Sequence, residues 1–205
     1  MTYNDIKTLV LAYSDREDAE VINNIDSFIL LTEAILNRKL KVGGMATRSV
    51  TTTTIEKEYY TLPDNFAGLR DIEIRDSLDS ISRTTLQYLS PEQLNQASGV
   101  HDGPFYTLIA NQIQLVPRQD AKLMEVIYYK KVPNLSDIND SNWVSENFPD
   151  CYVYGILVEL SAFVKNADAS RLWNEKFKTV IQEIKDDDAT SRWSGTALQT
   201  RIELN

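Results

Sequence analysis

Apolar residues recur every three or four positions near both ends of this 205-residue chain, whereas the middle carries strand-like patterns. That spacing places an apolar stripe along one face of a helix. No single amphipathic helix can bury its own stripe, so the two helical ends are expected to pack together. Runs of helices flanking a run of strands predict an α+β fold rather than an α/β fold.

The predicted arrangement is a helical bundle with an inserted antiparallel β-domain. Residues 1–44 and 142–190 are expected to form the helical core, and 45–141 the inserted β-rich domain. Residues 191–205 follow the last helix as an extended C-terminal arm.

Local signals place the helix ends. Thr2 and Asp5 are spaced as a capping box for a first short helix, and Ser14 and Glu17 as a box for a second, longer one. The Gly43-Gly44 pair is expected to stop that second helix. The final helix is expected to run out in "KDDD" at 185–188.

The middle region is built from short β-branched and aromatic runs such as "TRSVTTTT", "KEYYTL", "LRDIEIR" and "QIQLVP", separated by turn residues. The run "KLMEVIYYKK" at 122–131 has apolar residues on both faces, which indicates a strand that is covered twice, in a sandwich or at an interface. We therefore predict a subunit or tail interface at five residues: Met124, Val126, Tyr128, Tyr59 and Tyr60.

Composition and motifs argue against several functions. A formal charge of −9 without clustered Lys and Arg makes sequence-wide nucleic-acid binding unexpected. One cysteine (Cys151) and one histidine (His101, in a Gly-containing loop) provide neither a disulfide framework nor a metal-ligand cluster. No phosphate-binding Gly-rich motif, secretory signal or membrane-length apolar run occurs. We predict no catalytic residue, cofactor or metal.

Paired carboxylates remain the one enzymatic alternative. Six acidic residues lie close together in the strand region: Glu56, Glu58, Asp64, Asp71, Glu73 and Asp76. A glycoside hydrolase needs two carboxylates about 5–10 Å apart, one of them with a raised pKa. The alternate spacing of Glu56 and Glu58, and of Asp71 and Glu73, instead indicates the outward face of strands.

The C-terminal arm has no periodicity but carries large apolar residues beside arginines, a composition that favours docking on a partner over disorder. Packing on its own domain is the alternative. The candidate anchors are Arg192, Trp193, Leu198, Arg201, Ile202 and Leu204.

A set of stretches in this order resembles the head-to-tail adaptor proteins of tailed bacteriophages, in the branch similar to podophage tail-accessory factors. The set is "NRKLKVGGM", "YYTLPDNFAGLRDIEI", "LQYLSPEQL", "YTLIANQIQLVP", "MEVIYYKKVPNLSD", "NWVSENFPDCYVYGILVEL" and "RWSG". The resemblance covers about residues 3 to 196.

This resemblance implies a structural protein of the virion neck, made in the host cytoplasm. It implies a ring of about twelve copies under the portal, extending the DNA channel and joining the head to a tail tube or nozzle. The C-terminal arm would bind the portal, and genomic DNA would pass without sequence-specific contacts or any membrane role. Two other functions stay open: a virion-associated peptidoglycan hydrolase using a carboxylate pair among Glu56, Glu58, Asp64 and Asp71, and a plain soluble binding domain.

Overall fold

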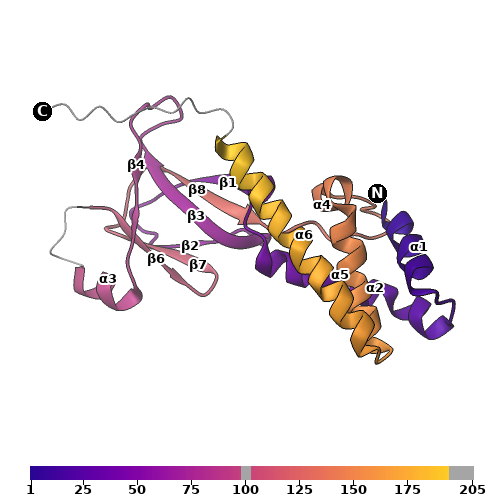
Figure 1. The fold of residues 1–205 in the computed structure, drawn as a ribbon. Helices are drawn as coiled ribbons and strands as arrows, with labels where there is room; N and C mark the ends of the chain where they lie inside the picture. Colours follow the sequence, from indigo (N-terminus) through magenta and orange to yellow (C-terminus); the bar gives the residue numbers. More distant parts are fainter. Residues whose placement is uncertain (98–102, 194–205) are drawn as a thin grey trace, which may run out of the picture. The chain divides into compact units, whose positions relative to one another are not determined.

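The computed structural model describes residues 1–97 and 103–193. It confirms the α+β class: in sequence order, helices precede and follow the strands, which form two β-sheets (Figure 1). The chain divides into two compact units: a helical unit of Met1–Gly44 with the chain from Val132 onward, and a β-unit of Met45–Lys131.

The helical unit is built around one central helix. Its helices are α1 (Tyr3–Ser14), α2 (Ala19–Lys39), α4 (Trp143–Asn147), α5 (Pro149–Phe163) and α6 (Ala167–Trp193). Helix α5 packs against all four others, and its buried side chains form much of the unit's core. Gly155 permits this packing, because a Cβ there would lie 2.4 Å from Thr32 of α2 and 3.0 Å from Phe177 of α6.

The helix boundaries differ from the predicted ones in three places. The Thr2–Asp5 capping box forms as predicted. Ser14 instead ends α1 and its hydroxyl donates to Leu11, so α2 begins four residues later than a Ser14–Glu17 box requires. Helix α2 also ends at Lys39, before the glycine pair, which lies in a short 3₁₀ turn, η1 (Gly43–Met45).

Helix α6 is the third difference, because it continues through "KDDD" to Trp193. Two contacts support its last turns. Ile184 is buried, and the Asp188 carboxylate accepts a hydrogen bond of 2.6 Å from the Gly43 backbone N–H. The predicted arm from 191 therefore starts as helix.

The β-unit is a sandwich of two four-stranded sheets. Its strands are β1 (Ala46–Thr52), β2 (Tyr59–Thr61), β3 (Phe66–Arg75), β4 (Thr84–Thr85), β5 (Gln87–Tyr88), β6 (Phe105–Ile109), β7 (Gln112–Val116) and β8 (Leu123–Lys130). One sheet has the order β1-β8-β3-β4 and the other β2-β7-β6-β5. All pairs are antiparallel except β5–β6, and a short helix, α3 (Pro91–Ala97), contacts β6.

The core of the β-unit draws buried side chains from both sheets. Ile72 and Val126 come from the first sheet, and Ile113 and Leu115 from the second. Two sheets that interdigitate their inner side chains in this way form a sandwich with its own hydrophobic interior.

The segment 132–141, predicted to belong to the β-domain, lies with the helical unit. Val132 donates its backbone N–H to the Asn37 side chain of α2 at 2.8 Å, and Leu135 donates its own to Glu33 at 2.7 Å. These contacts attach the segment to α2, so the boundary falls at Lys131.

Candidate interaction surfaces

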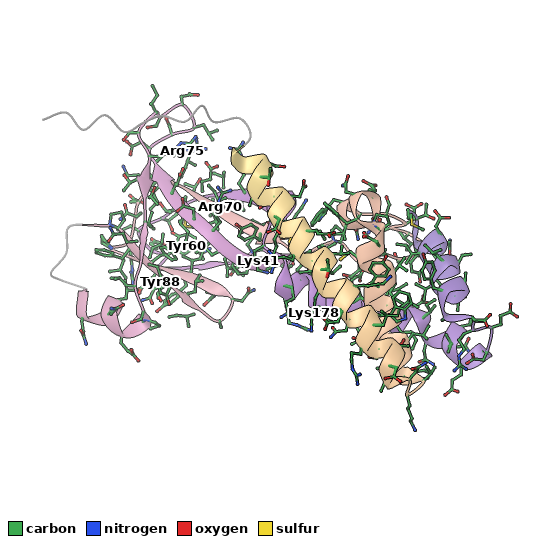
Figure 2. All side chains as sticks on the ribbon, in the orientation of Figure 1. Lys41, Tyr60, Arg70, Arg75, Tyr88 and Lys178 are labelled. Atoms are coloured by element: carbon green, nitrogen blue, oxygen red, sulfur yellow. The ribbon has the colours of Figure 1, made fainter. Side chains whose placement is uncertain are left out.

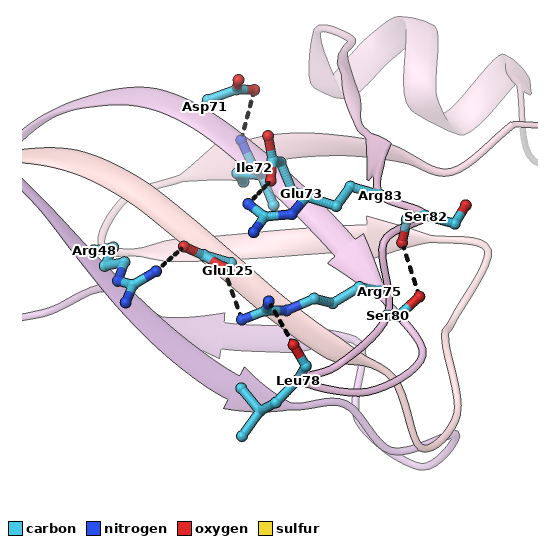
Figure 3. A network of polar contacts seen from close by, with 10 residues as sticks. All are labelled: Arg48, Asp71, Ile72, Glu73, Arg75, Leu78, Ser80, Ser82, Arg83 and Glu125. Carbon is cyan, nitrogen blue, oxygen red and sulfur yellow. Dashed lines mark hydrogen bonds and ion pairs between the residues drawn. The ribbon is translucent and has the colours of Figure 1, made fainter.

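The outward face of the first sheet carries a polar network (Figure 3). The Glu125 carboxylate of β8 forms ion pairs with Arg75 of β3 and Arg48 of β1, with nitrogen–oxygen distances of 3.0 and 3.2 Å. Glu125 and Arg75 are buried, whereas Arg48 is exposed. Arg75 also donates to the Leu78 carbonyl in the β3–β4 loop, which fixes that loop to the sheet.

Three acidic side chains of the strand region, Glu58, Asp71 and Glu73, make structural contacts, whereas Glu56 and Asp64 are exposed. Glu58 accepts hydrogen bonds from Arg118 and Gln114, and those bonds, with Arg118 the larger cause, hold the pKa of its carboxyl below the ordinary value. Glu73 pairs with Arg83 at 3.1 Å, and Asp71 accepts the N–H of Ile72. The lowered pKa of Glu58 does not suit the acid of glycoside hydrolysis, which needs a raised pKa.

Four of the five predicted interface residues lie inside the β-sandwich. These four side chains are each no more than 5% exposed: Met124, Val126 and Tyr128 of β8, and Tyr60 of β2, which is labelled in Figure 2. The second sheet covers this face of β8, which explains the apolar pattern without a partner. Only Tyr59, at 42% exposure, lies on the surface.

The predicted portal-binding residues are the last two described residues and four that lie beyond them. Arg192 and Trp193 are the final residues of α6. Leu198, Arg201, Ile202 and Leu204 lie outside the described residues, as does His101.

A cleft of about 380 Å³ lies beside the end of α6. Its lining includes the apolar residues Val42, Trp143, Phe148 and Ile184, and also Ser191 of α6. The Trp143 indole packs on the bare backbone of Gly44, where a Cβ would come within 3.4 Å of the ring. The glycine pair therefore allows close contacts from α4 and α6. The sequence indicated it only as a helix stop, because these contacts come from distant parts of the chain.

A buried carboxylate joins three parts of the helical unit. Glu33 of α2 is 2% exposed and accepts hydrogen bonds from the Leu135 N–H and, at 3.2 Å, from the Tyr152 hydroxyl. Asn142 donates to the same hydroxyl while it caps α4. Burial raises the pKa of the Glu33 carboxyl above its ordinary value.

Three further features of residues 1–97 and 103–193 bear on function. No group of three or more His, Cys, Asp and Glu side chains lies close enough in these residues to hold a metal ion. Cys151 is buried, and burial raises the pKa of its thiol far above the ordinary value, so the thiolate needed for reactivity is suppressed. No helix among the described residues combines the length and apolar character needed to span a membrane.

The profile of the SU10 adaptor protein family matches residues 1–201. The chain belongs to this family and is a structural head–tail adaptor of a bacteriophage, acting between portal and tail components at the virion neck. No match to a curated protein was found.

Proposed function

We propose that this adaptor assembles as a ring of about twelve copies beneath the portal, extending the DNA channel toward a tail tube or nozzle. The family match over residues 1–201 is the observation that carries this proposal. The ring forms in the virion neck from subunits made in the host cytoplasm.

The portal contact in this proposal is made by the C-terminal arm. Helix α6 ends at Trp193, less than one helical turn beyond Ser191, which lines the cleft beside Trp143. The arm's large apolar residues, Leu198, Ile202 and Leu204, suit anchoring on a partner surface, and Arg192 and Arg201 suit hydrogen bonding at its rim.

The acidic balance of the subunit suits a channel that DNA must slide through. The 30 acidic residues outnumber the 21 Lys and Arg residues, so the net charge of −9 repels the phosphates of DNA. The DNA contact is therefore proposed to be free of sequence-specific binding.

Light scattering on the full chain, alone and mixed with the portal protein of its own phage, tests this function. We expect free chains that join the portal in a defined number of copies. Truncation after Trp193, and a full-length variant with Leu198→Ser, Ile202→Ser and Leu204→Ser, should both abolish joining, and the second variant controls for arm length. A full chain that ignores the portal would contradict the ring, whereas variants that still join would contradict only the arm.

A further inference from the structure

The cleft beside Trp143 is open on the surface of the helical unit. Trp143 and Phe148 line it and are only partly buried, and their rings meet edge to face with centroids 6.4 Å apart. Its volume of about 380 Å³ lies in the size range of pockets that hold a ligand. We call it the Trp143 cleft.

The Trp143 cleft follows the last turns of α6. Four residues of that helix line it: Ile184, Asp187, Asp188 and Ser191. They recur every three or four positions, so they share one face of the helix. The helix ends at Trp193, soon after Ser191. The chain beyond the helix therefore starts beside one end of the cleft.

The sequence after α6 has the means to turn back along the helix. Gly195 follows Trp193 by two positions, where glycine commonly ends a helix in a left-handed turn that folds the chain over the last helical turn. The five residues from Ser194 to Leu198 span at most about 17 Å when extended. Ile184 lies nine residues before Trp193, about 14 Å along the helix axis. Leu198 and the residues after it can thus reach every level of the cleft.

The end of the C-terminal arm has the pattern of a strand with one apolar face. Successive side chains of an extended chain alternate, so Leu198, Ile202 and Leu204 share one side. Thr200 shares that side too, whereas Arg201 falls on the other. This apolar side matches the aromatic and aliphatic lining of the Trp143 cleft.

Charge at the rim of the cleft fits the same occupant. Asp187 is exposed and forms no ion pair with any residue in 1–97 or 103–193. Arg201 is the one Lys or Arg in the sequence from 194 to 205. A long arginine side chain can follow an apolar surface and place its guanidinium at a carboxylate on the rim.

We propose that, in the free subunit, the C-terminal arm folds back into the Trp143 cleft of its own chain. Leu198 and Ile202 lie on the aromatic lining, and Arg201 pairs with Asp187. The tether favours this occupant over a second copy, because a short linker gives a local concentration of about millimolar. The portal then takes the arm from the cleft. That last step rests on the proposed function, whereas the cleft contact does not.

Disulfide trapping in the full chain tests the cleft contact. Asn147→Cys places a thiol at the cleft, on the exposed last residue of α4. Thr200→Cys places the second thiol on the apolar side of the arm and removes none of its three large anchors. The natural Cys151 is buried and does not react. We expect mild oxidation of the dilute double variant to join positions 147 and 200 within one chain, as identified by mass spectrometry.

The matched control combines Thr200→Cys with Ala189→Cys. Ala189 is exposed, is closer to Thr200 along the chain, and lies roughly 140° around α6 from Ile184. A tether without a preferred site would join position 189 at least as fast as position 147. We expect the 147–200 disulfide to form about ten-fold faster or more. Formation at an equal or lower rate would overturn the proposal and leave the proposed function intact.

A charge reversal tests release to the portal. Asp187→Arg repels Arg201 and changes no proposed portal anchor. Asp186→Arg alters the net charge equally, on the side of α6 away from the cleft, and is its control. We expect Asp187→Arg to slow the 147–200 disulfide about three-fold or more and to let the chain join the portal at about three-fold lower concentration, because more free arm is available. Asp186→Arg should behave as the wild type.

The outcomes separate the steps. Equal disulfide rates in the two charge variants would overturn the pairing of Arg201 with Asp187. A slower disulfide with unchanged joining would overturn the release step. A wild-type arm that is trapped in the cleft of a chain that never joins the portal would contradict the proposed function alone.

Discussion

At the residue scale, the two arginines that meet Glu125 differ in burial and should differ in energetic weight. Arg75→Met leaves a buried carboxylate without its buried partner, and we expect a loss of about 3–5 kcal/mol in the free energy of unfolding. Arg48→Met removes an exposed partner and should cost about 1 kcal/mol or less. Urea unfolding of both variants measures the contrast, and equal losses would contradict it.

Glu33 predicts a pH dependence of stability. Because burial raises the pKa of its carboxyl above the ordinary value of 4.5, the folded protein retains a proton that the unfolded chain releases. Its stabilising contribution is therefore complete below the ordinary value and is lost as pH rises through the raised value.

The Glu33→Gln variant, which cannot ionise, isolates this effect. The free energy of unfolding of the variant, relative to that of the wild type, should increase as pH rises between about 4 and 8. Urea unfolding at several pH values provides the test, with Glu183→Gln on the exposed face of α6 as the control expected to show no such gain. If the difference in unfolding free energy between Glu33→Gln and the wild type stays constant with pH, this explanation is wrong.

At the element scale, Gly155 sets how closely α2, α5 and α6 pack. Gly155→Ala should destabilise the protein by about 1–3 kcal/mol through overpacking, although alanine favours the helix by about 1 kcal/mol. Thr32→Ser removes the methyl group that a Cβ at position 155 would meet at 2.4 Å, while keeping the hydroxyl bond to Phe28.

A double-mutant cycle of Gly155→Ala and Thr32→Ser measures this contact by urea unfolding. The serine should restore most of the stability lost by the alanine variant. Additive losses in the double variant would show that the Thr32 methyl is not the obstacle.

At the scale of the whole molecule, the two units each have their own core, and all three tryptophans (143, 173 and 193) lie in the helical unit. Ile113→Ala in the core of the β-unit should cost about 2–5 kcal/mol. We expect it to move the β-unit part of the unfolding transition seen by circular dichroism while the tryptophan fluorescence midpoint stays in place. A fluorescence midpoint that shifts equally would show that the units unfold together.

The sequence by itself determined the order and type of the elements, because the periods of helices and strands and the Thr2–Asp5 cap are local properties. Interactions between distant residues decided the remainder. Helix α6 continues past its acidic run, where the Gly43–Asp188 hydrogen bond and the burial of Ile184 support its last turns. Alternation showed that Met124, Val126 and Tyr128 share a face, but only the second sheet showed that the face is a core, since a strand pattern does not specify what covers it.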